Sequence, residues 1–248
     1  MKNLSTIAVC ALLGACADGV ELGSTESHVE SANRLAVNRL AVNRLAVNRL
    51  AVNRLAVNRL AVNGMADASA DAEALAAQDG GLELLSYMVS CALPERAALV
   101  VAGQVLPGSI GLAPQWIEEG LDVPARRWLT ACLLARVNYF GVEVRLSLRG
   151  AHDALATSAE ERAAYPLYEG AFWGDLFGES AQKTSCTSQL KASGAAIGTL
   201  PLRECTVTDA TTGRTRCDYT PAGICEEVCA GAACAGGTET IHVFLETP

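Results

Sequence analysis

The strictest constraint on how this chain can fold is a five-residue repeat. The phrase NRLAV occurs six times without variation between Asn33 and Val62. In an α-helix, five steps turn successive Leu residues about 140° apart, so they spread over every side. In a flat strand, an odd period sends them alternately to opposite faces. The tract therefore cannot provide one apolar face for either element, and we predict a low-complexity spacer over residues 33–63.

The repeat resembles the pentapeptide-repeat family in part. That family forms a square solenoid in which a central Leu or Phe points inward on each five-residue side. Here Asn stands two residues before each Leu, where the family has a small residue, and Arg stands directly before it. Six sides make only about one and a half coils, fewer than a solenoid needs to bury its core. The central positions are those of Leu35, Leu40, Leu45, Leu50, Leu55 and Leu60.

The first residues carry an export signal. Lys2 gives a minimal positive region, Leu4 to Leu13 form a short apolar run, and the motif LGAC ends at Cys16. LGAC resembles the lipobox of bacterial lipoproteins, which implies that the Cys16 thiol receives a diacylglyceryl group and becomes the mature N-terminus. We expect a lipoprotein signal peptide over residues 1–15 and a polar tether over residues 16–32.

An ordinary secretory signal cleaved before Asp18 is the alternative, and both interpretations imply export. The apolar run is too short to span a bilayer, for which about 20 apolar residues are needed. We therefore expect the protein in the bacterial cell envelope. The lipid on Cys16 is its expected membrane contact, at the outer membrane or cell surface rather than the inner membrane.

Charge is unevenly distributed along the chain. The net charge is −8, yet each copy of the repeat carries one Arg and no acid. An acidic body argues against nucleic acid as a partner, because such binding relies on cationic contacts to phosphates. The Arg tract is the part suited to an anionic envelope polymer such as lipopolysaccharide or peptidoglycan. Its cations are Arg34, Arg39, Arg44, Arg49, Arg54 and Arg59.

Organised periodicity follows an Ala-rich, acidic lead-in over residues 64–80. The stretch LELLSYMVSCALP has helical spacing and ends at Pro94, and ALVVA from Ala98 reads as a buried strand. A second helix is predicted from Asp122 to a stop at Gly141.

Two further strands alternate between apolar and polar residues. The first has its inward face formed by Val142, Val144, Leu146 and Leu148, with Ser147 facing outward. The second is TIHVFLE near the C-terminus. Mixed helices and strands predict an α+β fold, a small disulfide-stabilised globular domain over residues 81–248.

Eight Cys residues follow the expected anchor, an even number that predicts up to four disulfides in an exported protein. Cys91 and Cys132 lie on or beside the apolar stripes of two predicted helices, so we expect them to pair. Zinc is the alternative for Cys217, Cys225, Cys229 and Cys234, but these lack the C-x-x-C spacing of zinc knuckles, and we expect no metal. The eight are Cys91, Cys132, Cys186, Cys205, Cys217, Cys225, Cys229 and Cys234.

Signals for catalysis are weak, and no catalytic residue or cofactor is predicted. PGSIG around Ser109 differs from the G-x-S-x-G nucleophile elbow at its first Gly, and no helix is predicted directly after it. His152, with Asp153 beside it, follows a predicted strand, but adjacent side chains seldom orient one another as base and partner. A hydrolase that uses Ser109 or His152 therefore remains the alternative function.

An aromatic segment is the best candidate for a ligand site. YPLYEGAFWGDLFG has aromatic residues at helical spacing, in two stripes, which favours burial. Aromatic side chains outside a core mark binding surfaces, and here the candidates are Tyr168, Phe172 and Trp173.

Taken together, the LGAC motif, the NRLAV tract and the Cys-rich region resemble envelope lipoproteins of large-genome soil bacteria. The stretches GSIGLAP, WLTACLLARVNYFGVEVRLSLRG and YEGAFWGDLF carry that resemblance, which implies an address without a reaction. We expect a non-enzymatic binding module on a spacer, or a structural envelope component. The sequence does not indicate a protein partner or the identity of a ligand.

Overall fold

The computed structural model describes residues 60–65, 69–140, 144–194, 203–235 and 237–247, together with the backbone of residues 36–38. All of them belong to one compact unit that extends from Ala32 to the C-terminus. Helices and sheets are mixed and four disulfides join them, which confirms the predicted α+β class and the disulfide-stabilised domain. No helix among the described residues is both long enough and apolar enough to cross a membrane.

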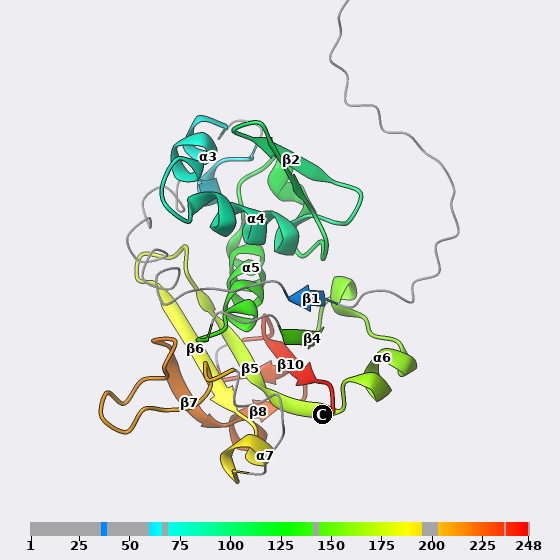
Figure 1. Ribbon diagram of the computed structural model, residues 1–248, viewed down its shortest axis with the longest axis vertical. Helices are drawn as coiled ribbons and strands as arrows, with labels where there is room; N and C mark the ends of the chain where they lie inside the picture. The colour runs from blue at the N-terminus through cyan, green and yellow to red at the C-terminus, as the bar shows by residue number, and fades with distance from the viewer. Residues whose placement is uncertain are drawn as a thin grey trace, which may run out of the picture. The chain divides into compact units, whose positions relative to one another are not determined.

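A six-stranded sheet forms the centre of the fold, with the strand order β1-β4-β10-β5-β6-β7 (Figure 1). Neighbouring strands run antiparallel, except that β6 and β7 are parallel. The strands are β1 Ala36–Asn38, β4 Val144–Arg149, β5 Leu167–Asp175, β6 Gln182–Thr187, β7 Thr220–Ile224 and β10 Ile241–Leu245.

The helix α5, Val123–Arg136, packs against β5 and β10 and covers one face of the sheet. Its start is as predicted, because the Asp122 carboxylate accepts a hydrogen bond from the Ala125 N–H at 2.8 Å. The helix ends at Arg136 rather than near Gly141, since Val137 is already extended. The Asn138 side chain then accepts from the Phe140 N–H and forms a local turn instead of another helical turn.

A smaller layer of helices and a hairpin packs on the far end of α5. It contains α3 Ser69–Ala76, α4 Gly81–Ala92, β2 Ala98–Val101 and β3 Gln104–Pro107. The prediction that β2 is buried was wrong, because Val100 and Val105 lie opposite each other and are 67% and 66% exposed. The tight turn at Ala102 and Gly103, both with positive φ, closes a two-stranded hairpin outside the main sheet, which leaves one face open.

Short elements complete the chain. They are the 3₁₀ turns Pro114–Ile117 and Asp153–Leu155, the helices α6 Ala159–Ala164, α7 Gln189–Ala192 and α8 Cys225–Val228, and the hairpin strands β8 Cys229–Ala230 and β9 Ala233–Cys234.

The last copy of the repeat is part of the core. Leu60 is fully buried, and its carbonyl accepts a hydrogen bond from the Trp116 indole N–H at 2.8 Å. Gly64 allows this close approach, because a Cβ atom there would lie 2.4 Å from the main chain of Glu118. In the lead-in, Leu75 is also fully buried. Leu60 and Leu75 thus belong to the core ahead of the residue 81 expected from composition, and β1 in the repeat joins the main sheet as well.

Within the described parts of the two alternating strands, the residues follow their predicted faces with one exception, and Val142 lies outside the described residues. Ile241, Val243 and Leu245 of β10 are buried on one side of the sheet, as expected. In β4, Ser147 was predicted to face solvent but is fully buried. Its hydroxyl accepts a hydrogen bond from Arg149 Nε at 3.0 Å.

The four disulfides link Cys91 to Cys132, Cys186 to Cys225, Cys205 to Cys217 and Cys229 to Cys234. The expected pairing of Cys91 with Cys132 is confirmed and joins α4 to α5. Disulfides in this number indicate an oxidising, extracytoplasmic compartment.

Candidate functional site

The aromatic segment forms the central strand β5, so the helical spacing read from the sequence was wrong. Successive residues of a strand point to opposite faces. Phe172 is fully buried in the main core, whereas Trp173 packs on the other face with Cys186 and Cys225. The three predicted ligand residues therefore do not form one patch, and Phe172 has no exposed surface to offer a ligand.

Tyr168 has a local partner instead of a ligand. Its hydroxyl donates to His242 Nδ1 at 2.8 Å, and His242 Nε2 lies 3.3 Å from the Ala232 carbonyl in the β8–β9 hairpin. Burial lowers the pKa of His242, which keeps the ring neutral, and raises the pKa of Tyr168. A neutral ring with its proton on Nε2 satisfies both contacts, so these side chains hold the hairpin against the sheet.

Trp173 lines a cleft of about 180 Å³ at the end of the sheet. Gly174 lies beside it on β5, Gln182 and Thr184 come from the neighbouring β6, and Arg127 comes from α5. The remaining walls are Ala222 of β7, Ala235 and Glu239. This volume is below the roughly 300–1,000 Å³ of drug-sized ligand sites, so the cleft suits one small group.

Polar groups with hydrogen-bonding capacity face this cleft. Trp173 lines the cleft with only 5% of its surface exposed, and its indole N–H is a hydrogen-bond donor. Arg127 and Glu239 form an ion pair at 3.8 Å across the cleft. Such a long, partly exposed pair contributes little stability, so a ligand can replace it at small cost.

Gly174 keeps the cleft open beside the indole. Its φ of 142° lies in a region that side chains rarely adopt, and a Cβ atom there would be 2.1 Å from the Gln182 carbonyl oxygen. The glycine lets β6 approach β5 closely, which places Thr184 opposite Trp173 and Gln182 two residues before it on the same strand. Gly170 is required in the same way, because a Cβ atom there would lie 2.3 Å from the Cys186 carbonyl oxygen on β6.

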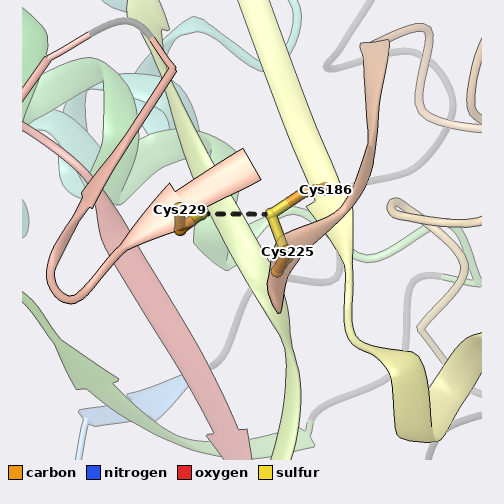
Figure 2. Close-up of side chains that lie close together, drawn as sticks. All are labelled: Cys186, Cys225 and Cys229. Atoms are coloured by element: carbon orange, nitrogen blue, oxygen red, sulfur yellow. Dashed lines mark hydrogen bonds between the residues drawn. A yellow bond between two sulfur atoms is a disulfide. The ribbon is translucent and has the colours of Figure 1, made fainter. Parts of the chain in front are cut away.

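A cluster of sulfur atoms lies on the same face of the sheet as the cleft. The Sγ atoms of Cys186, Cys225 and Cys229 all lie within 4.8 Å of one another, and those of Cys186 and Cys229 are 3.8 Å apart (Figure 2). Cys217 is not part of the cluster, because it pairs with Cys205. Zinc binds thiolates, whereas every sulfur here belongs to a disulfide, so the oxidised cluster offers no metal ligand.

No protein-family model, curated protein or solved structure matches this chain. Its site is therefore interpreted from its own geometry. Cys16 and the six Arg residues of the repeat lie outside the described residues, so lipidation and polymer binding stay predictions.

The two residues considered for hydrolysis are not assembled into a catalytic pair. His152 Nδ1 accepts from the Ala154 N–H at 3.1 Å, and the ring packs edge-on against Trp128. Burial lowers the pKa of His152, so its ring is neutral near pH 7. Ser109 is exposed, and within the described chain no hydrogen bond joins it to His152.

The sequence did not identify four polar residues of the cleft, which are Arg127, Gln182, Thr184 and Glu239. They are spread over the chain and match no motif, and the pairing of β5 with β6 together with the packing of α5 on β5 gathers them at the cleft. Of the predicted candidates, Trp173 alone reaches the cleft.

Proposed function

We propose that this chain is an exported, lipid-anchored binding module and that its Trp173 cleft holds one small polyhydroxyl group, such as a sugar residue of an envelope polymer. The observation that carries this proposal is a small cleft that Trp173 lines together with the side-chain donors and acceptors of Arg127, Gln182, Thr184 and Glu239. The LGAC motif supports anchoring through Cys16. The four disulfides support export.

A polyhydroxyl group matches the mixture of polar groups in the cleft. The Gln182 amide and the Thr184 hydroxyl can each donate and accept, and the Arg127 to Glu239 pair adds one charge of each sign. Hydroxyl groups also donate and accept, so a single sugar residue can satisfy several of these groups at once. A fully anionic or fully apolar ligand would leave part of the lining unsatisfied.

Binding can be measured with the disulfide-intact protein and soluble oligosaccharides of N-acetylglucosamine, by calorimetry and by tryptophan fluorescence. Loss of the Gln182 hydrogen bonds in Gln182→Ala should weaken binding about threefold to tenfold. Gln104→Ala on the exposed β3 strand is the matched control and should bind as the parent does. Equal affinity of the parent and Gln182→Ala, or no binding to any oligosaccharide tested, would reject the cleft as the site.

Anchoring requires a separate measurement. Mass spectrometry of the mature protein should show a diacylglyceryl group on Cys16, and Cys16→Ser should release the protein from the membrane fraction. An unmodified chain that starts at Asp18 would contradict the lipid anchor and leave the cleft proposal intact.

A further inference from the structure

The two disulfides behind the cleft lie close enough to exchange partners. Cys186–Cys225 joins β6 to the start of α8, and Cys229–Cys234 closes the β8–β9 hairpin four residues further along the chain. The nonbonded sulfurs of Cys186 and Cys229 are 3.8 Å apart, and Figure 2 shows Cys229 facing the inner disulfide. Exchange requires a thiolate to reach a disulfide sulfur, and this contact places one within reach.

The outer disulfide is the accessible one. Cys229 is partly exposed, and Ala230, Gly231 and Ala232 in the hairpin turn are exposed, whereas Cys186 and Cys225 are buried. Cys229–Cys234 also closes the shortest loop of the four bridges, with a separation of five residues. A short loop restricts the unfolded chain least, so this bridge contributes least to stability through chain entropy.

We propose that the protein has a thiol–disulfide exchange site in which Cys229–Cys234 reacts with an external dithiol and Cys229 then passes the exchange inward to Cys186–Cys225. This site is independent of the oligosaccharide proposal. Its substrates are dithiols of small molecules or of other exported proteins.

The reaction balances in two steps. One thiolate of an external dithiol attacks the outer disulfide to form a mixed disulfide, and its second thiol then displaces the protein sulfur and closes the external disulfide. The two electrons reduce Cys229 and Cys234; of the two protons released by the dithiol, one goes to Cys234 and the other to solvent, which leaves Cys229 as a thiolate. The Cys229 thiolate then attacks the Cys186 Sγ, the Cys186–Cys225 bond breaks, and Cys225 leaves as a thiolate that takes up a proton. The second step transfers no net electrons.

Removal of Cys234 tests the inward step directly. In Cys234→Ser, Cys229 is left as a free thiol beside the inner disulfide. The loop closed by Cys186 and Cys225 has a separation of 39 residues, and a bridge from Cys186 to Cys229 would add only four more. Chain entropy therefore differs little between the Cys186–Cys225 and Cys186–Cys229 bridges. In Cys234→Ser at pH 8, we expect each of the two bridges in at least about a tenth of the molecules.

The bridges can be assigned by peptide mapping after acid quenching and alkylation. Cleavage after Glu226 and Glu227 places Cys225 and Cys229 on different peptides, so a Cys186–Cys229 bridge with alkylated Cys225 is distinct. Cys217→Ser is the matched control: it frees the buried Cys205, whose Sγ contacts the Val137 carbonyl, and should show no new bridge. A single Cys186–Cys225 bridge in every molecule of Cys234→Ser would overturn the proposal.

A second measurement uses the unaltered protein, which avoids any failure of the variant to fold. During titration with dithiothreitol, alkylation should appear first at Cys234 and Cys229, followed by a species with the Cys186–Cys229 bridge and free Cys225. Opening of Cys186–Cys225 before Cys229–Cys234, or complete reduction without that bridge, would overturn the inward relay.

Discussion

Replacing Leu60 with Ala tests whether the last repeat copy belongs to the core. The Leu60 side chain is fully buried, and it packs in the main hydrophobic cluster. Truncation of a fully buried Leu to Ala costs about 3 kcal/mol, through lost transfer free energy and the cavity left behind. For a domain of this size, that loss lowers Tm by about 6–12 °C.

The repeat supplies its own control, because Leu50 has the same five-residue surroundings. The spacer was predicted over residues 33–63, and the buried Leu60 corrects only its end. It gives Leu50 no packing role, so Leu50→Ala should leave Tm unchanged within about 1 °C. Both variants change intrinsic helix propensity and the unfolded chain equally, so their difference isolates packing.

The assay is thermal and urea unfolding under oxidising conditions, followed by far-UV circular dichroism. The slope of the urea transition should stay constant, which assigns the effect of Leu60→Ala to stability rather than to compactness. Equal Tm values for Leu60→Ala and Leu50→Ala would show that the last copy is not a core element. Equal large losses in both would mean that other copies pack as well, against the spacer prediction.

Two further predictions concern buried ionisable groups. Glu169, fully buried, pairs with Arg203 at 2.8 Å and Lys191 at 3.0 Å; burial alone would raise its pKa, but these two cations outweigh it and lower the pKa. Glu169→Gln leaves both cations uncompensated and should lower the free energy of unfolding in urea by about 3–5 kcal/mol. Asp218→Asn, at an exposed ion pair, should lower it by less than about 1 kcal/mol, and similar losses in the two variants would contradict this account. Burial lowers the pKa of His242 in the folded protein, so as pH falls the ring binds a proton in the unfolded chain before it does in the folded one. The contribution of neutral His242 to the free energy of unfolding is therefore complete above pH about 6.5 and is lost as pH falls from there toward the folded pKa. Stability measured between pH 7 and 5 should fall less steeply in His242→Gln, and an unchanged slope would exclude His242 as its source.

Local chemistry made part of the fold predictable. The Asp122 cap and the apolar periodicity after it identified α5, and strict alternation identified β10. Cys91 and Cys132 could be paired because both stood beside apolar stripes of helices. In each case, the signal lay within a few residues of the element that it predicted.

The cleft depends on contacts between segments that are far apart in the sequence, and no local sequence pattern predicts such contacts. The spacing of aromatic residues in β5 fits a helix as well as a strand. The register between β5 and β10 also shifts near Tyr168, so the side chains of β5 do not follow a simple alternation between the two faces of the sheet. The pairing of β5 with β6 brings Gln182 and Thr184 near Trp173, and a contact between the main sheet and the separate β8–β9 hairpin brings Cys229 to Cys186. Identical local sequence likewise gives no sign that the Leu of the last copy, Leu60, is buried in the core.

Because Leu60 is buried and all six copies are identical, the gene can lose a repeat unit without changing the sequence that enters the core. If one unit is lost from the gene, for example residues 58–62, the preceding unit comes to stand directly before Asn63 and presents the same Leu, Ala and Val to the same neighbours. Each unit is a ready substitute for the one in the core. The number of copies can therefore drift between generations while the buried position is always refilled, and a deletion of residues 58–62 should melt at the parental temperature where Leu60→Ala does not.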